Sequence, residues 1–100
     1  MAPNNATAYF LRGMTSAQLG NHQAAIEDYN QAIALDAASP LAYIGRGVSE
    51  LKDGNYDTAQ TDFQTAADLF WQRKKIAEYR AMKQFIQQLS QGMIVSEDDF

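Results

Sequence analysis

Apolar and small residues recur along the chain at spacings of three and four, the period of a helix with one buried face. Tyr9, Gly13 and Ala17 share one side of a first segment, and Ala25 and Tyr29 share one side of the next. Alanine is abundant and β-branched residues are few, which also favours helices. The pattern predicts an all-α chain.

Glycine, asparagine and proline mark the ends of the predicted helices. Gly20-Asn21 and Gly54-Asn55 each join a residue that tolerates the left-handed conformation to one that caps the following helix. Ser39-Pro40 supplies a cap and a proline at the first helical position. These signals divide the first two thirds of the chain into four helices.

The same arrangement occurs twice, because shifting the sequence by 34 residues aligns ten identical pairs. They are Ala8/Ala42, Tyr9/Tyr43, Arg12/Arg46, Gly13/Gly47, Gly20/Gly54, Asn21/Asn55, Ala25/Ala59, Asp28/Asp62, Ala32/Ala66 and Leu35/Leu69. Small residues at these places allow close approach of helices, and the aromatic residues fill the remaining space. The chain therefore contains an internal helical-hairpin repeat.

This repeat resembles the tetratricopeptide repeat (TPR), a helix–turn–helix unit of 34 residues. The matching residues are Tyr9 and Tyr43 at the first aromatic position, Gly13 and Gly47 at the glycine, and Ala25-x-x-x-Tyr29 and Ala59-x-x-x-Phe63 in the second helix. The resemblance implies a right-handed α-α superhelix in a single domain spanning residues 1–100. The expected parts are repeat 1 at about 6–39, repeat 2 at about 40–73, a capping helix at about 76–90 and an acidic tail at 92–100.

The last third has two competing interpretations, one continuous helix over residues 57–90 or two helices joined by a turn. The apolar face changes side across Gln72-Arg73-Lys74-Lys75, which favours a turn there and a capping helix after it. The segments 66–70 and 86–89 resemble the endings of short bacterial TPR proteins, including cyanobacterial ones. The acidic tail that follows is either disordered or a docking peptide with Phe100 as its apolar anchor.

Composition removes several function classes. The chain has no cysteine, and His22 is its only histidine, so neither thiol catalysis nor a zinc site of cysteines and histidines is expected. No catalytic triad, phosphate-binding glycine loop or hydride-cofactor motif is present. We expect a protein that is not an enzyme, binds no metal and needs no cofactor.

The net charge of −4 hides an uneven distribution. Residues 1–72 carry three basic and eight acidic side chains, residues 73–83 carry five basic and one acidic, and the tail adds three acidic. The basic residues Arg73, Lys74, Lys75, Arg80 and Lys83 form a candidate contact surface, although nucleic acid and membrane are unlikely partners on this composition. Asp28 and Asp62 recur in the repeat, and their expected partners are Arg12 and Arg46.

The TPR resemblance also implies where a partner binds, because first helices of successive repeats line a concave groove. The groove positions are Phe10, Met14, Ala17 and Gln18 in repeat 1 and Ile44, Val48, Leu51 and Lys52 in repeat 2. The expected function is a cytoplasmic protein-interaction or scaffolding module that binds a partner peptide or helix there. The alternative is a homodimer that closes its own groove or exchanges the last helix, and a third cover for the groove is the chain's own last helix.

Overall fold

The computed structural model describes residues 4–92, which form five α-helices and no strand. Their bounds are α1 Ala6–Gln18, α2 His22–Leu35, α3 Pro40–Lys52, α4 Tyr56–Gln72 and α5 Ile76–Ser90. The expected acidic tail lies outside the described residues from position 93 onward. The all-α prediction is confirmed, and α4 and α5 are two helices separated at residues 73–75.

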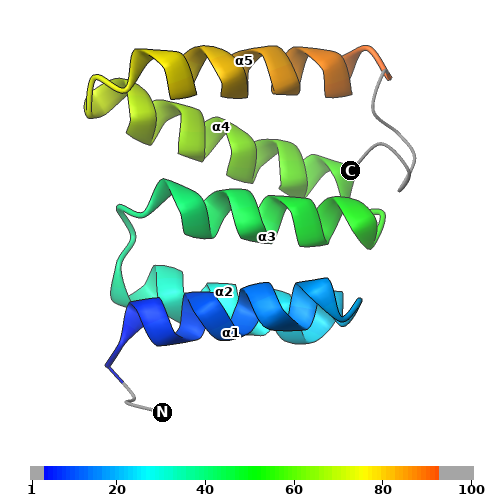
Figure 1. Ribbon diagram of the computed structural model, residues 1–100. Helices are drawn as coiled ribbons and strands as arrows, with labels where there is room; N and C mark the ends of the chain where they lie inside the picture. The colour runs from blue at the N-terminus through cyan, green and yellow to red at the C-terminus, as the bar shows by residue number, and fades with distance from the viewer. Residues whose placement is uncertain (1–3, 93–100) are drawn as a thin grey trace.

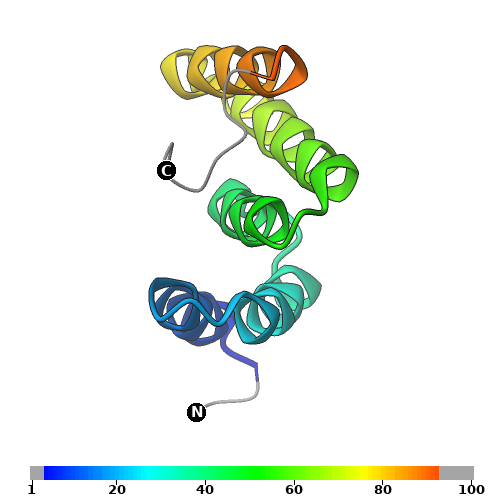
Figure 2. The same ribbon diagram turned by 90° about the vertical axis from the view of Figure 1, so that its right-hand side faces the viewer.

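Each helix packs on its neighbour in sequence, so the molecule is a stack of antiparallel layers (Figure 1). Seen from the side, α1 and α3 lie on one side of the stack, α2 and α4 lie on the other, and α5 closes the end (Figure 2). This packing of adjacent helices agrees with a helical-repeat superhelix.

Aromatic rings set the spacing inside the stack. Tyr29 is 2% exposed, and its ring lies so close to Gly13 and Gly45 that a Cβ on either glycine would approach it within 3 Å. Phe63 is fully buried and packs in the same way against Gly47. The small residues of the repeat therefore admit the large rings, as the sequence pattern predicts.

Three turns share one geometry in which the residue after the helix cap adopts a positive φ. Gly20 (φ 81°) and Gly54 (φ 86°) follow α1 and α3, and Lys74 (φ 59°) follows α4. In each turn this residue donates its N–H to the carbonyl three positions earlier, at 3.0 Å. The α4–α5 turn is thus a third copy of the turn within each repeat, with lysine in place of glycine.

Candidate functional site

An apolar pocket opens between the N-terminal ends of α1 and α3. Its volume is about 270 Å³, and the C-terminal end of α2 contributes to its wall. It is lined by Ala6, Thr7, Phe10, Leu11, Ala32, Asp36, Ser39, Leu41 and Ala42. The buried alanines Ala32 and Ala42 leave room for the opening because they have no bulk beyond Cβ.

Large apolar side chains surround this pocket while remaining in contact with solvent. Leu11 is 54% exposed and Leu41 is 56% exposed. Met14, which is 39% exposed, lies one turn beyond Phe10 on the same side of α1. Exposed leucine is common on protein surfaces, but apolar side chains gathered around one opening indicate a binding surface.

The Phe10 ring is held in place by its contact with the buried Tyr29. The two rings lie 5.9 Å apart, centroid to centroid, in a tilted arrangement. Tyr29 in turn is fixed between Gly13 of α1 and Gly45 of α3. The position of Phe10 is therefore set by the core, which gives the pocket one rigid wall.

The predicted groove positions fall in different surroundings in the two repeats. In repeat 1, Met14 and Gln18 are exposed, and Phe10 and Ala17 are half-buried. In repeat 2, Leu51 is buried with Phe63, and Ile44 and Val48 pack against the same core together with Met82, Phe85, Ile86 and Leu89 of α5. Lys52 is half-buried. Of the eight predicted groove positions, the two that are exposed to solvent, Met14 and Gln18, both lie on repeat 1.

Ion pairs join the two helices of each repeat, at the positions expected from the sequence. Arg12 donates from Nε and Nη2 to the two Asp28 carboxylate oxygens at 2.8 and 2.7 Å, and Arg46 does the same to Asp62 at the same distances. Both aspartates are buried. Hydrogen bonding to the carboxylate is the main reason that the pKa of each arginine is raised.

Glu50 adds a second carboxyl group beside the Arg46–Asp62 pair. Burial is the main cause that raises its pKa from 4.5 to about 8, followed by a hydrogen bond with Asp62 and the negative charge of Asp62, while Arg46 opposes the shift. Its Oε1 atom is buried and accepts no hydrogen bond among the described residues. Repeat 1 has Ser16 at this position, so only repeat 2 carries this carboxyl pair.

The five basic residues of the candidate contact surface lie on the α4–α5 turn and along α5, and all five are exposed. The Arg73 guanidinium donates to the carbonyl of Ala38 in the α2–α3 loop, and Lys83 Nζ donates to Gln64 Oε1 at 3.3 Å. The α4–α5 turn therefore contacts the α2–α3 loop, and α5 is linked to α4 by polar contacts as well as apolar ones.

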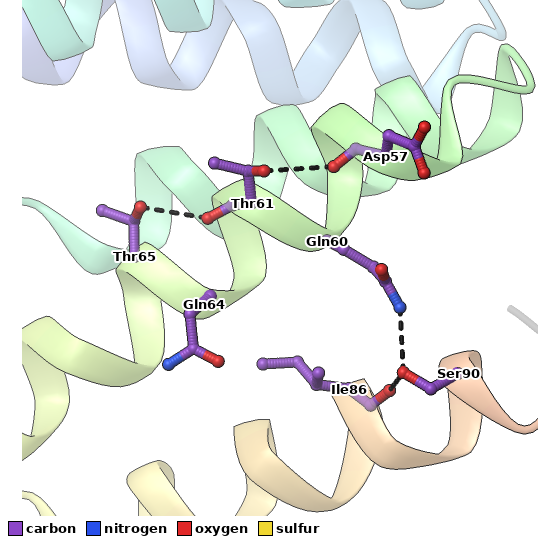
Figure 3. Close-up of a pocket in the computed structure, with 7 residues that line it drawn as sticks. All are labelled: Asp57, Gln60, Thr61, Gln64, Thr65, Ile86 and Ser90. Atoms are coloured by element: carbon purple, nitrogen blue, oxygen red, sulfur yellow. Dashed lines mark hydrogen bonds between the residues drawn. The ribbon is translucent and has the colours of Figure 1, made fainter.

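A second hollow, polar in character, lies between α4 and α5 (Figure 3). Its volume is about 390 Å³, and it is lined by Asp57, Gln60, Thr61, Gln64, Thr65, Ile86 and Ser90. Gln60 Nε2 donates to Ser90 Oγ at 3.0 Å, which ties the two helices together at one end of the hollow. We call this hollow the α4–α5 trough.

Among residues 4–92 no cluster of three or more histidine, aspartate or glutamate side chains is arranged to hold a metal ion. Within the same residues, none of the helices combines the length and the apolar character needed to cross a membrane.

Leu11, Leu41 and Gly45 matter to the apolar pocket and were not singled out by the sequence. Leu11 and Gly45 occupy the same repeat position, so no identity marked either of them. The signal that the sequence did contain was the difference between the two repeats at this position. A leucine in one repeat and a glycine in the next mean that α3 approaches Tyr29 closely while α1 presents an apolar side chain to solvent.

Comparison with protein families gives a match that agrees with this geometry. A family model described as TPR repeat matches residues 15–54, which extend from the second half of α1 through α2 and α3 to the turn before α4. No curated protein matches the chain.

Proposed function

Because the matched segment and the five-helix stack fit a short TPR protein, we propose that the chain is a non-catalytic module whose apolar pocket binds a partner protein. The TPR repeat suggests protein–protein interaction, and the family is generally non-catalytic. The proposed binding surface consists of the pocket at the ends of α1 and α3 and its continuation along Met14, Ala17 and Gln18.

The observation that carries this proposal is the exposure of Leu11 and Leu41 at the mouth of a pocket whose floor is made of alanine. An apolar side chain of a partner would fill the pocket and remove both leucines from water. Complete burial of a side chain of this size contributes about 1.5–3 kcal/mol. Two or three such contacts are enough to hold a helix or an extended peptide.

Charge narrows the class of partner. Asp36 lines the pocket, and residues 1–72 carry five more acidic than basic side chains. A segment with an apolar anchor flanked by lysine or arginine complements this surface better than an acidic one. The proposed ligand is therefore a basic, apolar peptide or helix.

The test begins with peptides selected from a display library on the wild-type protein. Their affinity is then measured for Leu41→Glu, Met14→Lys and a control, Leu19→Lys, which changes an 80% exposed leucine outside the pocket. We expect affinity to fall at least about tenfold for the first two variants, a loss of about 1.4 kcal/mol, and to be unchanged for the control. Equal binding by Leu41→Glu, with circular dichroism unchanged, would rule out this surface.

A second copy of the chain is the alternative occupant. Light scattering from low to high micromolar concentration separates the two cases, since a mass that doubles in the wild type and not in Leu41→Glu assigns the pocket to a homodimer. Exchange of α5 between copies is a distinct route to a dimer, and it would replace the contacts of Phe85 with the Phe63 cluster by the same contacts from another chain.

A further inference from the structure

The α4–α5 trough leads from one end of α5 to an exposed aromatic cluster at the other. Ser90 and Gln60 mark its near end, and Lys83 and Gln64 lie further along. Residues three and four apart lie on the same face of a helix. By this spacing, the face of α5 that lines the trough also carries Ile76, and the corresponding face of α4 carries Trp71. Trp71 is 58% exposed, and its ring lies 5.0 Å from that of Tyr79.

Positive charge lies along the same surface, and no ion pair among the described residues neutralises it. Within residues 4–92, none of the five basic residues of positions 73–83 forms an ion pair with a carboxylate, unlike Arg12 and Arg46. The nearby acidic side chains are Asp68, which accepts a hydrogen bond from Gln64, and Glu78 on α5. The surface therefore combines excess positive charge with exposed apolar rings.

We propose that the occupant of this surface is the chain's own segment 93–100, which lies outside the described residues. In this arrangement the segment runs back along α5 in the trough. Its carboxylates at Glu97, Asp98 and Asp99 lie beside Arg80 and Lys83, and Phe100 packs on Trp71 and Ile76. The trough thus serves as a docking site for an acidic segment that ends in an aromatic residue.

Length supports this arrangement. Eight residues in extended conformation span about 26 Å at 3.3 Å per residue, and the axis of α5 from Gly92 back to Ile76 covers about 24 Å at 1.5 Å per residue. By the same arithmetic, the six residues to Asp98 span about 20 Å and Arg80 lies about 18 Å from Gly92. In one extended conformation, the acidic residues can therefore reach Arg80 while Phe100 reaches Ile76.

Local geometry supports the reversal of direction that docking requires. Gly92 has a φ of 74° and donates its N–H to Leu89, the geometry in which a chain leaves a helix by turning sharply. The trough then offers the side-chain amides of Gln60 and Gln64 to an extended backbone, and Ile86 to the apolar residues Met93, Ile94 and Val95 (Figure 3). These three residues precede the acidic ones, which keeps the carboxylates away from Asp57 at the near end.

Trp71 is the only tryptophan of the chain, so its fluorescence reports directly on the far end of the trough. We expect Phe100→Ala, and separately a chain ending at Gly92, to shift the emission to longer wavelength and to raise the acrylamide quenching constant about twofold, because Phe100 no longer shields the ring. Ser96→Ala, a change in the same segment at a residue with no proposed contact, is the matched control and leaves the position of the emission unchanged. Unchanged emission and quenching in the chain ending at Gly92 would overturn the proposal.

Charge reversal tests the electrostatic part. Arg80→Glu with Lys83→Glu is expected to reproduce the spectrum of the chain ending at Gly92, and adding Glu97→Lys, Asp98→Lys and Asp99→Lys to that variant is expected to restore the wild-type spectrum. If Arg80→Glu with Lys83→Glu leaves the emission spectrum of Trp71 unchanged, the proposed pairing is contradicted.

Dilution decides between docking within one chain and docking onto a second copy. Docking within one chain gives the same emission at every concentration, whereas a shift to longer wavelength on dilution would assign the site to a second copy and overturn the proposal as stated. A peptide of residues 93–100 at about 1 mM, close to the effective concentration of a short tether, should return the emission of the chain ending at Gly92 toward wild type. Failure of the peptide to do so contradicts the proposal.

Discussion

Glu50 is the residue at which the two repeats differ most in chemistry. It places a second carboxyl group beside Asp62, whereas repeat 1 has Ser16 at the equivalent position. Burial and the neighbouring carboxyl group raise its pKa from 4.5 to about 8, so near neutral pH the folded protein holds a proton that the unfolded chain releases. Repeat 2 is therefore sensitive to pH in a way that repeat 1 is not.

The sign of this effect follows from the pKa values. The folded pKa of Glu50 lies above the unfolded one, so its contribution to the free energy of unfolding is fully present below pH 4.5 and is lost as pH rises through about 8. We expect Glu50→Gln to raise the free energy of unfolding at pH 8.5 by about 1–2 kcal/mol, a figure reduced for the partial exposure of Glu50, and to change it little at pH 5. Urea unfolding at the two pH values measures this. An equal effect at both would show that Glu50 ionises normally.

Lys74 is a second residue whose backbone conformation predicts a measurable effect. Its φ of 59° is left-handed, and a side chain with Cβ costs about 1–2 kcal/mol in that region. We expect Lys74→Gly to raise the free energy of unfolding by about 1 kcal/mol, measured by urea unfolding. The control Gln84→Gly lies inside α5 and should lower it by a similar amount. A loss of stability in Lys74→Gly would mean that the turn is not strained.

Individual residues were predictable where the repeat marked them. Gly13, Gly47 and the Arg12–Asp28 pair each recur after 34 residues, and each has the role that recurrence suggested. Gly45 and Glu50 occur in one repeat only, and their roles depend on distances to Tyr29 and Asp62 that come from the packing of helices. A repeat identifies what both units share, so the features that distinguish this chain were the ones that the sequence left open.

Among the helices, α5 depends most on its contacts with another element, since none of its residues is buried. Its apolar side chains Met82, Phe85, Ile86 and Leu89 are half-buried against the cluster around Phe63. The change of apolar face between α4 and α5 predicted the turn, because a single helix could not bury both faces on one stack. The sequence did not predict that Ile44 and Val48 belong to this cluster. Their place in it depends on the packing angle of α5, which the spacing of residues does not encode.

The Phe63–Phe85 contact gives the prediction for this element. The two rings lie 4.9 Å apart at 86°, an edge-to-face arrangement that adds to the apolar burial. We expect Phe85→Ala to lower the free energy of unfolding by about 2 kcal/mol, less than for a fully buried phenylalanine, and Gln84→Ala to leave it within about 0.5 kcal/mol. Chemical unfolding followed by circular dichroism measures both. A loss below about 0.5 kcal/mol for Phe85→Ala would show that α5 contributes little to the stack.

At the scale of the whole molecule, contacts run mainly between helices adjacent in sequence, and this makes stability a property of position along the stack. The fully buried side chains lie away from the two ends, with Ala25 on α2 and Ala59, Phe63 and Ala66 on α4. At the ends, α1 buries only Gly13 and α5 buries no residue. The ends should therefore open without the middle.

Hydrogen exchange tests this directly. We expect amide protection to be highest in α4 and lower in α1 and α5 by about 1–3 kcal/mol in opening free energy, which corresponds to roughly 5- to 150-fold faster exchange. Phe63→Leu, at the centre of the stack, should reduce protection in all helices, whereas Leu11→Ala at the α1 end should affect α1 and α2 alone. If protection is instead uniform and both variants lower it everywhere, the five helices unfold as one cooperative unit. In that case binding at the α1–α3 pocket would stabilise α5 as strongly as α1, and the two proposed sites would be coupled through global unfolding.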